Sequence, residues 1–459
     1  MAILGLRSSL DQAGVLWPAV PSVRASRLLA VLLQLQASER WPGRALQAAQ
    51  QRQLDALWRN ARANVPFYRD RYRDFDRDDG SAPCLGTEEW YRVPELHRGT
   101  VQRASATLRA AAVPQAHGKA FETRTSGSTG EPVAVLRTQL NQFFWEAAVL
   151  REHVWHGRDA GLTKAVIRAN GPAAPAPNGR TLKGWGLPFD KIWRCGPAYA
   201  LDMATDVAAQ AEWLRQRRPA YLLTYPTNLA ALLDELSADD LPGLRQVICV
   251  GESVTDELRR GCLERFGAKV VANYSSQEMG YMALECPDCG QYHVQSETVV
   301  LEVLSEAGQP CREGEVGRIV VTDLHNFAMP VIRYAIGDYA EVGTPCSAGR
   351  GLPSLKRIVG RERNMVVLPD GARHWPLTGF HRFGDVAPIR QFQFVQRTRE
   401  QIEVRLVCDR PLTAPQKDQL GCIIKEALGH PFQLEFRESE RPLARSSGGK
   451  FEEFVSLAD

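Results

Sequence analysis

The chain has 459 residues, roughly three times the length of a typical domain, which predicts two to four structural units and excludes a mini-protein held together only by disulfides. Its 56 basic and 53 acidic residues leave a net charge of +3, with 44% hydrophobic and 24% charged residues. This ordinary, near-neutral balance argues against a nucleic-acid-binding surface and against a disordered acidic tail.

The N-terminal region shows no targeting or membrane signal. The first twenty residues include Asp11 and lack the ordered basic, apolar and small-residue sections of a signal peptide. The longest apolar run, residues 28–35, is interrupted by Gln34 and is far shorter than the ~18 apolar residues of a spanning helix. We therefore expect a cytoplasmic protein without a membrane partner, in a compartment that keeps its ten cysteines reduced.

Residues 50–72 predict an amphipathic helix that ends at Pro66. The apolar residues at helical spacing are Leu54, Leu57, Trp58 and Ala61. Further along, residues 171–179 are rich in proline and alanine and predict a surface loop.

The middle of the chain has the clearest α/β pattern. Strand-like segments at 221–225, 247–250 and 269–273 alternate with helical segments at 227–236 and 255–266. This alternation predicts a large α/β body with a parallel sheet covered by helices on both faces. Ligands of such a sheet bind beyond the carboxyl ends of its strands.

The pattern changes after about residue 361. Alternating apolar residues predict strands at 392–394 and 402–406, followed by a helix at 420–428 and a third strand at 432–436. These elements predict a small α+β C-terminal domain of about a hundred residues.

Three polar motifs in the large body have residues suited to nucleotide chemistry. Residues 125–132, TSGSTGEP, offer glycine turns and hydroxyls for phosphate oxygens, although they lack the ending of a Walker loop. Glu278 lies just beyond the strand at 269–273, where a carboxylate can hold Mg²⁺ against phosphates. Asp338 follows a glycine and can accept ribose hydroxyl protons. Each of these, taken alone, is more often an ordinary turn residue.

Two further motifs lie in the C-terminal part, GRERN at 360–364 and RSSGGK at 445–450. A Gly-Gly-Lys segment usually means only an exposed lysine. A flexible loop is also how an enzyme delivers a lysine to a phosphate in one step and withdraws it in the next.

Cys286, Cys289 and His293 have C-x2-C-x3-H spacing, which supplies three zinc ligands from one short segment. A fourth ligand must come from elsewhere in the chain. The alternative is a set of free buried thiols.

In this order and spacing, the motifs resemble the adenylate-forming superfamily, and within it the phenylacetate-CoA ligase-like branch. The matching segments are TSGSTGEP, GES at 251–253, YSSQE at 274–278, TDLHNFAMPVIRYAIGD at 322–338, GRERN and the terminal GGK. The resemblance extends from ARANVPFY at 61–68 to Lys450.

The resemblance implies two groups of nucleotide-binding residues. The loop around the ATP phosphates would consist of Ser126, Gly127, Ser128, Thr129 and Gly130. The surroundings of the adenine would be formed by Gly251, Glu252, Ser253, Tyr274 and Ser275.

It also implies five single roles. Glu278 would coordinate Mg²⁺, Asp338 would bind the ribose hydroxyls, and Arg361 would contact the ribose or phosphate side. Arg363 occupies the hinge position between the domains. Lys450 would be catalytic, bridging the substrate carboxylate and the α-phosphate of ATP.

The implied activity is ATP-dependent conversion of a small carboxylic acid, aryl or similarly compact, to an acyl-adenylate with release of pyrophosphate. The acyl group then passes to coenzyme A, while a mobile C-terminal domain, residues 363–459, rotates against a body of residues 1–362. The alternatives are transfer to an amine or a carrier-protein thiol, and a nucleotide-binding homologue without catalysis. The acid cannot be named, although four aromatic residues are candidates for its pocket, or alternatively for the core: Phe143, Phe144, Trp145 and Tyr225.

Members of this branch resemble one another in a Cys-x-Cys-Gly-Arg segment, which here has a single cysteine, Cys346. We infer that Cys289 replaces the missing thiol. The expected zinc ligands are then Cys286, Cys289, His293 and Cys346, with Cys311 in reserve. Four protein ligands would make this site structural. The oligomeric state, including a homodimer, stays open.

Overall fold

The computed structural model describes the chain apart from residues 1–5, 11–12, 16, 125–132, 170–176, 375–382, 409, 442, 444–450 and 459. The chain divides into two compact units, Met1–Val359 and Gly360–Asp459. The boundary expected between residues 362 and 363 falls inside the short 3-10 turn η4, Glu362–Asn364. No described helix combines the length and the apolar character needed to cross a membrane.

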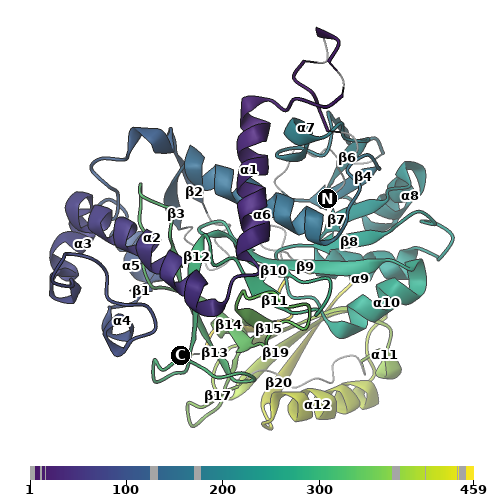
Figure 1. Cartoon of the computed structure of the whole chain (residues 1–459). Helices are drawn as coiled ribbons and strands as arrows, with labels where there is room; N and C mark the ends of the chain where they lie inside the picture. The colour runs from purple at the N-terminus through teal and green to yellow at the C-terminus, as the bar shows by residue number, and fades with distance from the viewer. Residues whose placement is uncertain are drawn as a thin grey trace. The chain divides into compact units, whose positions relative to one another are not determined.

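Two long helices, α1 (Val23–Ser38) and α2 (Gly43–Asn64), begin the first unit (Figure 1). The apolar face expected for α2 is confirmed, because Leu54, Leu57, Trp58 and Ala61 are all buried. The helix ends before Val65, whose backbone is extended, and Pro66 opens the separate short helix α3 (Pro66–Arg71). Proline disfavours a helical residue before it and suits the first helical position, where its missing N–H has no partner to lose.

A parallel sheet forms the centre of this unit, in the order β6-β4-β7-β8-β9. Its strands are β4 (Lys164–Arg168), β6 (Ala198–Asp202), β7 (Tyr221–Thr224), β8 (Gln246–Cys249) and β9 (Lys269–Ser276). The helices that alternate with them are α8 (Val207–Arg217), α9 (Pro226–Glu235) and α10 (Asp256–Phe266). The strands and helices expected between residues 221 and 273 are confirmed.

Helices cover both faces of this parallel sheet, as expected. One face packs against α8, α9 and α10, with Leu222 in that core. The other packs against α1, α6 (Gln139–Trp155) and α7 (Phe189–Ile192), with Tyr221 in that core. Neighbouring strand residues face opposite sides, which is why Tyr221 and Leu222 enter different cores.

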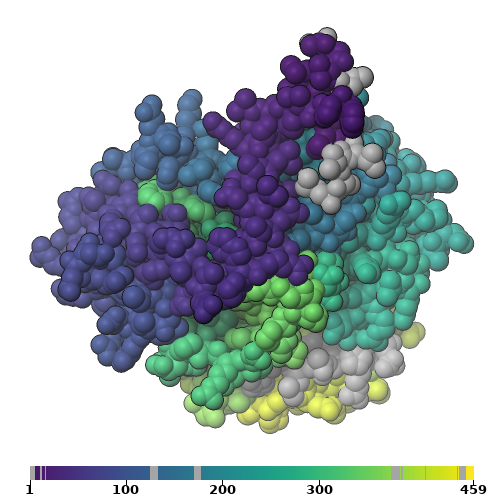
Figure 2. Space-filling view, viewed as in Figure 1, coloured from purple at the N-terminus to yellow at the C-terminus, as the bar shows by residue number. Residues whose placement is uncertain are grey.

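The sheet continues beyond β9 through strands that pair mostly antiparallel, apart from a parallel pair of β14 with β1, an extension that the sequence pattern did not indicate. These strands are β10 (Gly280–Glu285), β11 (Tyr292–Val294), β12 (Val299–Leu304), β13 (Val316–Asp323), β14 (Tyr334–Val342) and β15 (Ser354–Arg361). The smaller elements of the unit are η2 (Arg73–Phe75), α4 (Glu88–Arg92), β1 (Leu96–His97), α5 (Arg98–Arg103), η3 (Gln115–His117), the hairpin of β2 (Ala120–Arg124) and β3 (Ala134–Thr138), and β5 (Arg180–Leu182). Figure 2 shows the N-terminal segment and α1, in purple, on the surface.

The second unit contains a four-stranded sheet in the order β20-β19-β18-β21. Its elements are β16 (Val366–Val367), β17 (Arg373–His374), α11 (Phe383–Val386), β18 (Ile389–Gln396), β19 (Gln401–Cys408), α12 (Ala414–Leu428), β20 (Gln433–Ser439) and β21 (Phe454–Ser456). Helix α12 begins at a capping box of Thr413 and Gln416 and ends at Gly429, whose φ of 67° suits glycine. Its apolar stripe packs into the core of this sheet. The α+β fold expected here is confirmed, with β21 as an addition.

Candidate functional site

Two of the candidate motifs meet at a buried hydrogen bond. Tyr274 lies in β9 and Asp338 in β14, and the Tyr274 hydroxyl donates to Asp338 Oδ2 over 2.7 Å. Both side chains are buried, with 8% of each exposed. A carboxylate has about four acceptor positions, so Asp338 retains capacity for further hydroxyl donors.

Glu278 occupies the turn between β9 and β10 and is buried, with 7% exposed. The Ser276 hydroxyl braces this turn by accepting from the Met279 N–H over 3.1 Å. Gly280, at the start of β10, has a φ of 79°, a conformation that glycine adopts without strain. The turn therefore holds the Glu278 carboxylate at the end of β9, where the sequence predicts a cation ligand.

Arg137, near the end of β3, is a buried cation beside this turn whose placement the sequence pattern did not predict. Its Nη1 donates to the Gln277 carbonyl over 3.4 Å, and its guanidinium lies 5.2 Å from the Trp145 ring. Burial lowers the pKa of Arg137, and the carboxylates of Asp323 and Glu278 oppose that shift. A single arginine between a predicted strand and a predicted helix does not indicate, in the sequence, that its side chain lies beside the Glu278 turn.

The GES motif follows β8. Gly251 has a φ of 83° and turns the chain there. The Glu252 carboxylate accepts from the N–H and the hydroxyl of Thr227, over 3.0 and 2.8 Å. Because Thr227 is in the first turn of α9, Glu252 ties this loop to the positive end of that helix. Ser253 is exposed beside it, and Ser275 is partly buried in β9.

Several predicted site residues cannot be placed. The phosphate-loop residues Ser126 to Gly130 and the predicted catalytic Lys450 lie outside the described residues, as does the side chain of Arg363. Arg361 is the last residue of β15 and is partly buried. The roles inferred for all of these residues stay predictions.

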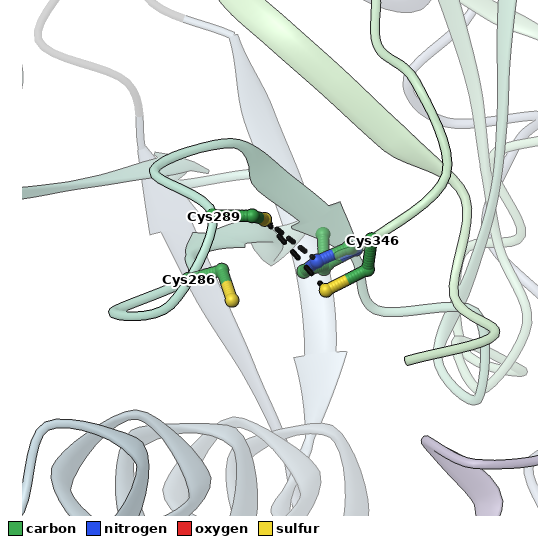
Figure 3. Close-up of side chains that lie close together, drawn as sticks. Cys286, Cys289 and Cys346 are labelled. Carbon is green, nitrogen blue, oxygen red and sulfur yellow. Dashed lines mark hydrogen bonds between the residues drawn. The ribbon is translucent and has the colours of Figure 1, made fainter. Parts of the chain in front are cut away.

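Four candidate zinc ligands converge in the first unit. Cys286 and Cys289 lie in the turn between β10 and β11, His293 lies in β11, and Cys346 follows β14. Their ligand atoms all lie within 4.8 Å of one another. Cys289 Sγ is 3.5 Å from His293 Nε2 and 3.7 Å from Cys346 Sγ (Figure 3). A tetrahedral zinc ion with Zn–S bonds of about 2.3 Å separates its sulfur ligands by about 3.8 Å, so this spacing fits.

The surroundings orient this cluster. His293 Nδ1 is 3.2 Å from the Leu352 carbonyl, an arrangement that leaves Nε2 toward the thiols. Arg350 Nη1 lies 3.1 Å from Cys286 Sγ. The reserve candidate Cys311 is elsewhere, packed beside Gly317 of β13. The structure therefore brings Cys346 into the cluster and leaves Cys311 out.

A narrow pocket adjoins the Glu278 turn. Its lining includes Arg137, Phe144, Trp145, Gly280, Asp323 and His325. Of the aromatic residues suggested for an acid pocket, Phe144 and Trp145 lie here, whereas Phe143 packs against the core around α1 and Tyr225 is buried in the core around α9.

Comparisons with known proteins agree with the motifs. The family model described as "AMP-binding enzyme" matches residues 198–328. Phenylacetate-coenzyme A ligase of Pseudomonas putida is 27% identical over 337 residues, which cover 70% of this chain and 72% of that protein. The enzyme of the same name from Escherichia coli K12 is 26% identical, with 70% and 72% covered.

Among solved structures, 2-hydroxyisobutyryl-CoA ligase in a postadenylation state has a similar fold. Its TM-score is 0.70 at 18% sequence identity, and the match covers 92% of this chain and 91% of that one. The likeness therefore includes residues of both units.

Proposed function

We propose that this chain is an AMP-forming acid-CoA ligase of the adenylate-forming superfamily, in its phenylacetate-CoA ligase-like branch, and that its acid is a compact, aryl or similarly sized carboxylate. The observation that supports this most is the meeting of two distant motifs, in which Tyr274 holds Asp338 while Glu278 lies at the end of the same strand. This arrangement supports a ribose-binding role for Asp338 and a cation-binding role for Glu278, which follows Tyr274 by four residues.

The first half-reaction joins two anions. A carboxylate oxygen of the acid attacks the α-phosphorus of ATP, and the bond to the pyrophosphate oxygen breaks. Positive charge must offset the negative charge that gathers in the transition state. We propose that Lys450 supplies part of it by bridging the acid and the α-phosphate.

Glu278 fits a Mg²⁺ ligand, because it is a buried carboxylate on a braced turn and oxygen is the ligand atom that Mg²⁺ prefers. When bound, the ion supplies charge neutralisation at the phosphates. Asp338, oriented by the Tyr274 hydroxyl, would accept the ribose hydroxyl protons and so fix the position of the nucleotide.

In the second half-reaction, the thiol sulfur of coenzyme A attacks the acyl carbonyl carbon, AMP leaves, and the thiol proton passes to solvent. Transfer to an amine or to a carrier-protein thiol is the alternative. The relatives named above are all CoA ligases, which favours coenzyme A. A cytoplasmic location and a homodimer stay predictions.

The test is acid-dependent exchange of pyrophosphate into ATP, followed by product analysis with and without coenzyme A. We expect exchange with at least one compact acid and a CoA thioester as product. Exchange that yields no thioester supports the amine or carrier alternative. Absence of exchange with every acid in a broad panel contradicts the proposal.

We also propose that Cys286, Cys289, His293 and Cys346 bind a structural zinc ion. Four protein ligands leave no position open for substrate or water. Metal analysis should find about one zinc per chain in the wild type and much less in Cys289→Ser. A wild type purified without added chelator and free of zinc would refute this assignment.

A further inference from the structure

Three residues that line the narrow pocket each have a buried polar atom without a hydrogen-bond partner among the described residues. These atoms are Arg137 Nε, Asp323 Oδ2 and His325 Nδ1. Only 3% of Arg137 and 4% of Asp323 are exposed. Leaving a buried polar group unsatisfied costs about 1–3 kcal/mol, so three such atoms in one pocket point to something that they bind.

The remaining bonds of these residues fix their positions. Asp323 Oδ1 accepts from the His325 N–H over 2.9 Å, which leaves Oδ2 as the oxygen without a partner. The His325 ring stacks on Phe144, with ring centres 4.0 Å apart and planes 12° apart. Arg137 is held by the Gln277 carbonyl and the Trp145 ring. All three polar groups are thus preorganised.

The pocket also lies close to the predicted chemistry. Its lining includes Met279 and Gly280, which directly follow Glu278, and Arg137 contacts Gln277, which precedes it. A compact acid whose carboxylate reacts near Glu278 could therefore extend its far end into this pocket.

Resting on the function proposed above, we propose that Arg137, Asp323 and His325 form a subsite for a single hydrogen-bonding substituent, a hydroxyl or an amino group, at the end of the acid remote from its carboxylate. Such a substituent donates to Asp323 Oδ2 or His325 Nδ1. A hydroxyl also accepts from Arg137 Nε. The preferred substrates are hydroxy- or amino-substituted compact acids, and their unsubstituted analogues are poorer.

Burial supports this pairing of donors and acceptors. It lowers the pKa of His325 to about 4, so the ring is neutral at pH 7 and can offer Nδ1 as an acceptor. The pocket is narrow, which suits one substituent and excludes a second ring. An ordered water molecule could satisfy the same atoms, and a substituent that reproduces its bonds would displace it at little cost.

The test compares matched acids by pyrophosphate exchange with the wild-type enzyme. The pairs are benzoate and phenylacetate against their meta- and para-substituted hydroxy and amino derivatives, in which the substituent is remote from the carboxylate. We expect kcat/KM for the best substituted acid to exceed that of its unsubstituted analogue by at least about 10-fold. The wild-type comparison does not depend on any variant folding.

Two variants then test whether the preference for substituted acids comes from His325 and Asp323. His325→Phe keeps the stack on Phe144 but removes Nδ1, and Asp323→Asn keeps the acceptor for the His325 N–H but replaces the other oxygen. Each should reduce several-fold the ratio of kcat/KM for the substituted acid to kcat/KM for its unsubstituted analogue. The control is His117→Phe, because His117 also packs on an aromatic ring, that of Phe327, but does not line the pocket.

The outcomes separate the two proposals. The subsite is overturned if the wild type exchanges pyrophosphate as fast with unsubstituted acids as with substituted ones and if neither variant changes that ratio. The ligase function would stay intact, and the pocket would then hold only water. Absence of exchange with every acid overturns the function and the subsite together.

Discussion

At the scale of single residues, the site depends on buried polar groups held by one or two neighbours. Tyr274 and Asp338 are separated by more than sixty residues in sequence and are joined by one hydrogen bond of 2.7 Å. A hydrogen bond to a charged group contributes about 1.5–3 kcal/mol, so its removal should be measurable.

We predict that Tyr274→Phe raises the KM for ATP by about 10-fold, because Asp338 loses the donor that orients it toward the ribose. The kcat should change less, since the reacting atoms are not touched. Steady-state kinetics with varied ATP checks this, with Tyr199→Phe on β6 as the matched control. An unchanged KM would show that Asp338 needs no such support or does not bind the nucleotide.

The buried Asp323 carboxyl makes the free energy of unfolding depend on pH. Burial raises its pKa from 3.8 to about 6, with Arg137 opposing the shift. The unfolded chain releases this proton near pH 4 and the folded chain only near pH 6, so the wild type loses stability relative to Asp323→Asn as the pH rises from 4 to 6. The relative loss is at most about 3 kcal/mol.

Thermal or urea unfolding of both proteins across this pH range measures the difference. If the difference in unfolding free energy between the wild type and Asp323→Asn does not change with pH, the pKa of Asp323 is the same in the folded and unfolded chains, which contradicts the prediction.

At the scale of elements, the alternation of strands and helices between residues 221 and 273 was sufficient to predict the parallel sheet, because that pattern is local. The extension from β10 to β15 was not predictable in this way, since it includes pairings between strands distant in sequence, such as β11 with β15. The cluster of candidate zinc ligands was predictable in part: three of them share one short segment, whereas Cys346 was identified only through the family resemblance.

The sequence alone could not predict that the residues of the proposed subsite lie together. Arg137, Asp323 and His325 come from β3 and from the end of β13 and the loop after it, and they meet only through the tertiary fold. Phe144 and Trp145 were identified as aromatic candidates, but periodicity alone could not separate them from Phe143, which packs in a core.

The proposed zinc site would join the β10–β11 turn to the segment after β14, so we expect its effect to be on stability. We predict that removal of zinc by a chelator lowers the unfolding temperature of the wild type by at least about 5 °C, because metal binding contributes to folding free energy. Cys289→Ser should lose most of this response.

The control is Cys422→Ser, which removes an exposed thiol in the second unit and should respond as the wild type does. Unfolding temperatures that do not change on chelation would argue against a structural metal.

At the scale of the whole molecule, one chain of two compact units would perform both chemical steps. The first unit contains Glu278, Asp338 and the proposed subsite, and the second contains Lys450 in sequence. If Lys450 serves only the first step, its loss should affect the two half-reactions unequally, which an unassigned surface lysine would not do.

The most direct measurement therefore compares the half-reactions in Lys450→Ala and the wild type, with the acid that the wild type uses best. Acid-dependent pyrophosphate exchange should fall by at least about 100-fold, because the cation that bridges the acid and the α-phosphate is gone. Thioester formation from supplied acyl-adenylate and coenzyme A should stay within a few-fold of the wild type. Equal losses in both steps, or unimpaired exchange, would contradict the account.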